Sequence, residues 1–166
     1  DGSILFHSRA TPYRLAGRSI DGGLTLSDLA PDQALPDPSD NGSLTTLSNG
    51  DLICTHNHDS DLRMNTVIKE SVDGGKTWNK KLFANKDAGV VDLIIDPNNS
   101  RVLYATTWNI RRTPYSLSSG GEGSALWKST DEGETWTNIS SRKGLPSGLW
   151  GISGVTVSPV NSDIVW

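Results

Sequence analysis

The chain has 166 residues, of which 34% are hydrophobic and 20% charged, and its formal net charge is −4. This is the composition of an ordinary globular domain with one apolar core. Lysines and arginines are dispersed and form no run, so we expect no nucleic-acid partner. We expect no membrane partner either, because no apolar stretch approaches the roughly 20 residues of a spanning helix. Asp1 follows no charged and apolar leader, which predicts a mature product or an excised piece.

Short apolar and β-branched runs predict strands along the whole chain, and no segment has helical periodicity, so the expected class is all-β. The first strands are expected at 4–6 and 13–19, with 24–29 leading away. The proline-rich stretch 31–42 is expected to be a crossing between sheets. Later strands are predicted at 44–48, 51–55, 65–71, 77–83, 90–96, 101–107, 125–129, 135–139, 154–158 and 163–166.

Two further features concern the third group of strands. The nearly continuous apolar runs 90–95 and 102–105 predict strands that are covered on both faces. A Ser/Gly-rich loop is expected between them and the next strand, over 109–124.

An eight-residue pattern, Ser-x-Asp-x-Gly-x-Thr-Trp, occurs at 71–78 and 129–136, and at 19–26 with Leu26 in place of the tryptophan. Asp and Gly between two strands predict a hairpin, because glycine adopts positive φ without steric cost. We interpret the aspartates as turn-forming groups, and we expect Trp78 to fold onto the apolar side of its own sheet. The shared positions of these three octets are Ser19, Asp21, Gly23 and Thr25; Ser71, Asp73, Gly75, Thr77 and Trp78; and Ser129, Asp131, Gly133, Thr135 and Trp136.

The octets recur at intervals of roughly 50–60 residues with several strands in each interval, a pattern typical of a β-propeller. The octet is the motif known as the Asp box, and the chain resembles the Asp-box β-propellers, which include sialidases and sortilin-like proteins. This resemblance implies one propeller segment with blades of four antiparallel strands. The blades are expected at about 1–42, 43–85 and 88–142, with the start of a further blade at 150–166.

About three blades cannot close a ring, and an open arc would expose two apolar flanks. Two arrangements remain open: a homodimer or other homo-oligomer that closes the propeller, with six blades in the dimer, or a segment of a longer propeller. In the dimer, the strand 154–158 is expected to join the sheet that 4–6 begins in the partner.

The stretch 1–85 resembles sialidases more closely than the octets alone require. The matching residues are Arg14, the stretch Asn41-Gly42-Ser43-Leu44, and Thr55-His56 followed by Arg63. The resemblance implies that Arg14 and Arg63 bind a substrate carboxylate, a task for which the planar guanidinium fork is suited. The alternative interpretation is that both arginines are solvated residues at strand starts.

The resemblance also indicates that this chain lacks the catalytic residues of sialidases. Where sialidases carry their catalytic tyrosine, this chain has Ala88-Gly89-Val90-Val91-Asp92-Leu93, and the family's other catalytic residues would precede Asp1. We therefore assign no catalytic residue and no cofactor, and expect no sialoside hydrolysis. The leading hypothesis is a sialidase-like propeller fragment that at most binds carbohydrate or a carboxylate-bearing glycan. A structural, self-assembling module without ligand is the alternative, and a glycoside hydrolase of the sialidase superfamily is the third.

The stretch 88–166 resembles sortilin-like and xyloglucanase-like propellers, on 91–97, 104–108 and Gly144-Leu145-Pro146. The family that the chain resembles thus changes near 85–89. This change indicates a recombined or engineered chain, with a natural mosaic as the alternative. The family resemblance implies a secreted or periplasmic protein if the chain is natural. Trp108 and Tyr115 are candidates for stacking on sugar rings, although blade packing explains such aromatic residues equally well.

His56 and His58 stand two residues apart, a spacing that suits Zn²⁺ if a third ligand is present. His7 is the remaining histidine, so we assign no metal site and leave the question open. Cys54 is the single cysteine, which excludes an internal disulfide, and we interpret it as a small core residue.

Overall fold

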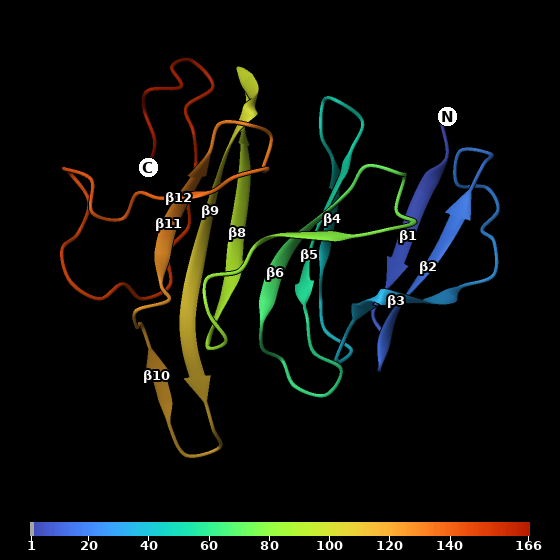
Figure 1. Ribbon diagram of the computed structural model, residues 1–166, viewed down its shortest axis with the longest axis horizontal. Coiled ribbons are helices and arrows are strands. Elements are labelled where there is room, and N and C mark those ends of the chain that lie inside the picture. The colour runs from blue at the N-terminus through green and yellow to red at the C-terminus, as the bar shows by residue number, and fades with distance from the viewer. Residues whose placement is uncertain (1) are drawn as a thin grey trace.

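The computed structural model describes residues 2–166, apart from the side chain of Arg112. Every regular element in this part of the chain is a strand, and the strands form three antiparallel sheets that lie side by side (Figure 1). The prediction of the all-β class is confirmed. Residues 2–166 contain no helix long and apolar enough to cross a membrane.

The first sheet has the order β1-β2-β3, and the second has the order β4-β5-β6-β7. The third contains β8, β9, β11 and β12, with β10 paired to the far end of β9. The bounds are β1 (Ile4–Ser8), β2 (Tyr13–Ser19), β3 (Ala30–Pro36), β4 (Ser43–Thr46), β5 (Leu52–Asn57), β6 (Thr66–Ser71), β7 (Asn79–Leu82), β8 (Ala88–Asp96), β9 (Asn99–Arg112), β10 (Leu117–Ser119), β11 (Ala125–Ser129) and β12 (Thr137–Asn138).

The third strand of the first sheet lies where the sequence predicted a crossing. The stretch 24–29 is not a strand, and β3 instead pairs with β2 through Pro31 opposite Leu15 and Pro36 opposite Tyr13. The prediction failed because β3 is an edge strand, so one side of its backbone needs no N–H donors and tolerates proline.

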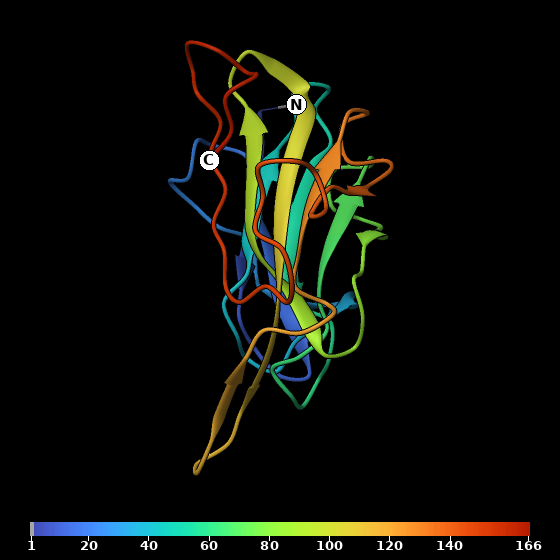
Figure 2. The same cartoon turned by 90° about the vertical axis from the view of Figure 1, so that its left-hand side faces the viewer.

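The loop predicted at 109–124 was also wrong in part. β9 continues to Arg112, turns over 113–116 and returns as β10, which makes a two-stranded ribbon that projects from the body (Figure 2). At the other end of the chain, the segments expected as strands at 154–158 and 163–166 form one isolated bridge between Val157 and Val165.

The three octets close with the same hydrogen bonds. In chain order, the serine hydroxyl donates to the aspartate at 2.7, 2.8 and 2.7 Å, and accepts from the glycine N–H at 2.8, 2.7 and 2.8 Å. The threonine N–H donates to the aspartate at 2.9 Å in each octet. The fifth-position glycines have φ of 95°, 89° and 94°, which side chains disfavour. Hydrogen bonds from Thr25 lower the pKa of Asp21 to about 2, so this carboxylate stays charged at neutral pH.

The sheets stack through two apolar layers. The first seam, between the first and second sheets, is built around Leu35, Cys54 and Trp78. The second seam, between the second and third sheets, is larger and contains Leu47, Ile53, Ile68, Leu82, Val90, Leu103 and Ala105. Trp78 therefore does not pack only on its own sheet as predicted, because its Nε1 donates to Asp32 of β3 at 3.0 Å.

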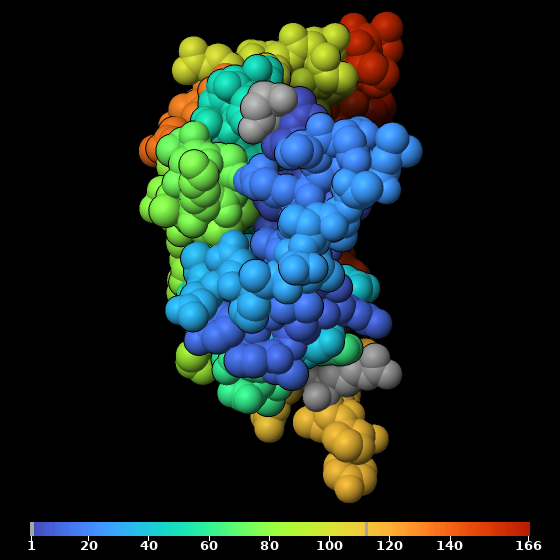
Figure 3. Space-filling view, turned by 90° about the vertical axis from the view of Figure 1, so that its right-hand side faces the viewer, coloured from blue at the N-terminus to red at the C-terminus, as the bar shows by residue number. Residues whose placement is uncertain are grey.

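The two outer faces of this stack differ. On the third sheet, Tyr104 and Leu126 are covered by Val155 and Val157 of the C-terminal segment. On the first sheet, whose side of the molecule Figure 3 shows, Ile4 and Phe6 are each 40% exposed, and Leu26 and Leu29 are exposed as well. The expectation of two bare flanks is therefore wrong for the third sheet, because the chain's own last residues cover it.

Candidate functional site

Arg14 and Arg63 converge on Asp40, which lies in the loop between β3 and β4. Arg14 Nη1 donates to the Asp40 carbonyl oxygen at 3.1 Å, and Arg63 Nε lies 3.8 Å from Asp40 Oδ2. The same Oδ2 accepts a hydrogen bond from Asn57 Nδ2 at 2.6 Å. Arg14 comes from β2, whereas Asn57 and Arg63 come from the end of β5 and the loop after it. Two sheets thus contribute to one charged cluster, which we call the Asp40 cluster.

The two arginines have different environments. The Arg14 side chain is 5% exposed and pairs with the fully buried carboxylate of Asp37, so the interpretation of Arg14 as a solvated residue is wrong. The Arg63 side chain is 66% exposed, as a solvated arginine would be, and Asp40 is its one ion-pair partner in the described part of the chain. Arg14 Nε is unpaired but buried, so of the two arginines only Arg63 presents its guanidinium to solvent.

Local backbone features hold both arginines in place. A Cβ on Gly42 would lie 2.7 Å from Arg14 Nη1 and 2.8 Å from the Thr55 carbonyl oxygen, so glycine is required where the guanidinium passes the chain. In the Arg63 loop, Asp59 Oδ1 accepts the N–H groups of Asp61 and Leu62, each at 2.8 Å. These backbone hydrogen bonds lower the pKa of Asp59 and keep the turn charged.

Trp108 lies at the same end of the strands as the Asp40 cluster, and contacts through Gly89 and Thr66 link the two. Gly89 pairs with Trp108, and a Cβ on Gly89 would lie 2.5 Å from Thr66 Oγ1. Thr66 in turn donates to Asn57 of the Asp40 cluster. Trp108 is half-buried with its Nε1 donating to Ser119 at 3.0 Å, whereas Tyr115 is exposed in the turn of the ribbon. The two candidate stacking residues thus occupy the base and the tip of the ribbon.

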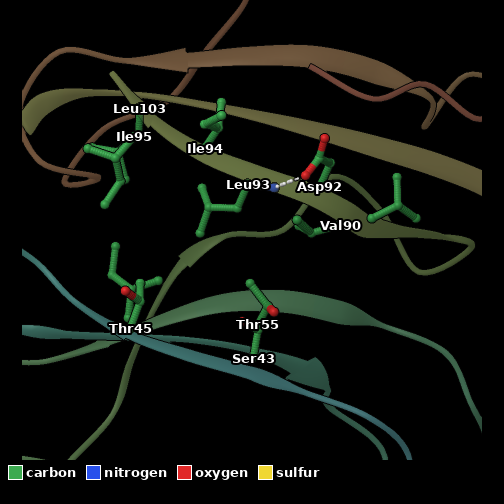
Figure 4. A pocket seen from close by; sticks show the side chains of 11 residues that line it. Ser43, Thr45, Thr55, Val90, Asp92, Leu93, Ile94, Ile95 and Leu103 are labelled. Carbon is green, nitrogen blue, oxygen red and sulfur yellow. Dashed lines mark hydrogen bonds between the residues drawn. The ribbon is translucent and has the colours of Figure 1, made fainter. Parts of the chain in front are cut away.

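A groove of about 460 Å³ separates the second and third sheets beside the second seam (Figure 4). Ser43, Thr45 and Thr55 line one wall with hydroxyl groups, and the apolar side chains of β8, including Leu93, line the other. The prediction that β8 is covered on both faces is wrong at 92–95, which are half-buried, because these residues border the groove.

The histidine pair lies inside the first seam. His56 is fully buried, and its ring meets that of His58 edge-on at 5.9 Å between centroids. Residues 2–166 contain no group of three or more His, Cys, Asp or Glu side chains placed to hold a metal ion. Cys54 is buried next to them, and burial raises the pKa of its thiol to about 12, so the thiol remains protonated.

Asp37 and Asp40 are the cluster residues that sequence analysis missed. Both lie in the proline-rich stretch that was expected to be only a crossing. Their spacing is explained by the fold, since Asp37 Oδ1 accepts the Asp40 N–H at 2.7 Å while its other oxygen meets Arg14. In the sequence the two aspartates lie 23 and 26 residues after Arg14, so no local signal links them to it.

No protein-family model matches this chain. An 82-residue stretch is 35% identical to the xyloglucanase Xgh74A of Acetivibrio thermocellus, and this match covers 45% of the chain and 8% of that protein. The crystal structure of a GH74 xyloglucanase from Xanthomonas campestris superposes over 93% of the chain and 24% of that structure, with 17% identity and a TM-score of 0.51. The chain is a partial β-propeller that resembles these proteins. The predicted fold class and resemblance are therefore confirmed.

A sialidase is also among the similar structures. The Hadza microbial sialidase Hz136 is 26% identical over 78% of the chain, covering 25% of that structure with a TM-score of 0.41. The partial propeller spans a small fraction of the length of the relatives it matches. It is thus related to propeller glycosidases over a limited segment.

Proposed function

We propose that this partial propeller binds a carboxylate-bearing glycan without hydrolysing it, and that Arg63 contacts the carboxylate. The observation that supports this proposal is the convergence of Arg14 and Arg63 on Asp40. Arg63 is exposed, and its distance of 3.8 Å from Asp40 leaves its guanidinium free to form a shorter, bidentate pair with a ligand. Arg14 acts as a positioning residue, because its side chain is buried and its Nη1 donates to Asp37 and Asp40.

Binding without hydrolysis follows from the residues of β8. Ala88 and Val90 stand where the resemblance to sialidases implies a catalytic tyrosine. Of the three tyrosines, Tyr104 is buried and Tyr115 lies in the turn of the ribbon. Tyr13 precedes Arg14 on β2 and is half-buried, and among the described residues no hydrogen bond joins it to the Asp40 cluster. A retaining mechanism needs a positioned nucleophile, which these residues do not supply.

Arg63→Ala is expected to remove glycan binding, because Arg63 is the arginine of the cluster whose side chain is exposed, whereas that of Arg14 is buried. Binding would be measured on an array of sialylated and neutral glycans, followed by titration of the best sialylated ligand. Arg63→Lys should retain weak binding, since an ammonium group cannot form the bidentate pair. Arg101→Ala, which removes an exposed arginine of the third sheet, is the matched control and should bind normally.

A fluorogenic sialoside is expected to release no fluorophore above the blank with the unaltered chain. Release above the blank would contradict binding without hydrolysis and would favour the glycoside-hydrolase alternative. Equal binding by the unaltered chain and Arg63→Ala would remove Arg63 from the site.

The second candidate function is self-assembly, which is favoured by the apolar face of the first sheet. Ile4, Phe6, Leu26 and Leu29 are exposed there together, and an apolar patch of this kind is typical of an interface. A six-bladed ring would form if this face met the third sheet of a second copy, with the C-terminal segment that covers that sheet lying within the interface or displaced from it. An obligate interface of this kind buries above roughly 2,000 Å² and leaves no stable folded monomer.

Light scattering is expected to report a dimer of the 17.8 kDa chain at micromolar concentration. Phe6→Asp should dissociate or unfold it, because a charge would enter the apolar interface. Leu117→Asp, at an exposed position on the projecting ribbon, should leave the mass unchanged. A compact, folded monomer would exclude the dimeric ring.

A further inference from the structure

The first seam contains buried histidines that have no hydrogen-bond partners. Both ring nitrogens of His7 and both of His56 are inaccessible to water and unpaired within the described residues. Since no ligand can reach these nitrogens while the seam is closed, they are poor candidates for metal or anion binding. They are instead groups that burial keeps neutral.

The groups around His56 are mostly cationic. The buried Lys69 of β6 and Arg14 of β2 act on it from two elements, and His58 meets its ring edge-on. Lys69 donates to the Ala34 carbonyl oxygen across the seam, and neighbouring Lys80 and burial lower the pKa of Lys69 to about 8. An imidazolium at His56 would therefore face the positive charges of Lys69 and Arg14, and among the described residues the Asn57 backbone is the one group that favours its protonation.

His7 has a similar environment on the opposite wall. Arg14 and Arg18 of β2 oppose its protonation, whereas Asp32 of β3 is the one carboxylate that favours it. Its ring lies 5.6 Å from that of Trp78, in an edge-on arrangement that anchors the second octet to the first sheet. A proton on His7 would thus disturb a contact that crosses the seam.

Open spaces border the first seam, as the groove of about 460 Å³ borders the second. A cavity of about 200 Å³ lies next to His7, Arg14 and Cys54, and another of about 740 Å³ lies beside Arg18 and Leu52. The second seam is mostly apolar, and its buried Glu70 is paired with Lys81 at 2.9 Å.

We propose that the first seam is an acid-sensitive joint: protonation of His7 and His56 separates the first sheet from the second, while the second seam remains closed. The opened seam hydrates both imidazoles and relieves their repulsion from Arg14 and Lys69. Opening also moves β2 away from β5, so it dismantles the Asp40 cluster. Acid would therefore release any ligand held there, independently of the ligand's own chemistry.

The pH window follows from the direction of the shifts. Burial lowers the pKa of His7 to about 4 and that of His56 to about 3, both below the ordinary value of 6.5. The stability that the two neutral histidines give the closed form over the opened form is therefore fully present above about pH 6.5. It is lost as the pH falls from 6.5 toward the lowered pKa values of the closed form. Between about pH 7.5 and pH 5.5, each histidine should raise the opening constant about tenfold, or about 100-fold for the pair.

Once separated from the second sheet, the three-stranded first sheet loses the buried face that stabilises it, so its own backbone hydrogen bonds open locally and its amides exchange. Hydrogen exchange of these amides therefore tests the proposal in the unaltered chain. Between about pH 7.5 and pH 5.5, protection factors of β2 should fall at least about 100-fold, and up to about 1,000-fold with the contribution of His58, whose pKa burial lowers to about 4. Those of β9 should stay within a few-fold. The amides of β9 serve as an internal control, since that strand lies in the third sheet. An equal loss in β2 and β9, or no loss in β2, would overturn the proposal.

Histidine variants distinguish the acid-sensitive joint from a general destabilisation of the fold by acid. The double variant His7→Leu/His56→Leu should lose most of the change in β2, retaining at most about tenfold from His58, whose Nδ1 is also unpaired. Ser8→Ala, on the outward side of β1, is the control and should behave as the unaltered chain. If the double variant does not fold, His7→Leu alone should reduce the change about tenfold, and an unreduced change in β2 would overturn the proposal.

Discussion

Trp78→Ala is expected to lower the free energy of unfolding by about 3–5 kcal/mol. Trp78 is buried in the first seam against Leu35 and Cys54, and its Nε1 donates to Asp32 of β3 at 3.0 Å. Truncation removes this packing from both sheets and leaves a cavity where the second octet meets the first sheet. The effect should therefore exceed that of losing a turn hydrogen bond in the same octet.

Urea titration of three variants separates these contributions. Trp78→Phe keeps most of the ring but loses the hydrogen bond to Asp32, so it should cost about 1 kcal/mol beyond the lost ring area. Asp73→Ala leaves turn donors unpaired and should cost about 1–3 kcal/mol. A neutral Trp78→Ala would contradict the role of Trp78 as the link between the sheets.

Local patterns were sufficient to predict the second sheet. Its strands are short apolar and β-branched runs, and the second octet specifies the hairpin between β6 and β7 through residues that are adjacent in sequence. The bounds predicted for these four strands differ from those observed by at most two residues. Repetition of the octet was also sufficient to predict the propeller architecture, because the repeat is visible without any long-range information.

Long-range features were not predictable in the same way. β3 is a strand only because it pairs with β2, and its prolines argue against a strand in any local window. The burial of Arg14 depends on Asp37, which lies 23 residues away, and on a glycine at 42 that lets the guanidinium pass the backbone. The coverage of the third sheet likewise depends on the fold of the last residues. The recombination point near 85–89, where the resemblance changes from one family to another, remains a prediction.

Arg14→Met is expected to lower the free energy of unfolding by about 3–5 kcal/mol, because it leaves the Asp37 carboxylate buried without its cation. The Arg14 side chain is 5% exposed and that of Asp37 is fully buried, so water cannot replace the lost partner. The loss of hydrogen bonding to the Asp40 carbonyl adds to the effect. Urea titration at about pH 7.5, where the first seam is closed, would measure it.

The double variant Arg14→Met/Asp37→Asn tests whether the ion pair between Arg14 and Asp37 accounts for the lost stability. Asparagine keeps an oxygen that accepts the Asp40 N–H, as Asp37 Oδ1 does at 2.7 Å, but carries no charge that needs a cation. Most of the lost stability should therefore return, since replacing both members of a buried pair costs less than removing one. If the double variant is as unstable as Arg14→Met, the pair is not the source of the loss. A stable double variant that still binds glycan through Arg63 would establish that Arg14 positions the cluster without contacting the ligand. A stable double variant that no longer binds glycan would instead make Arg14 a ligand-contacting residue.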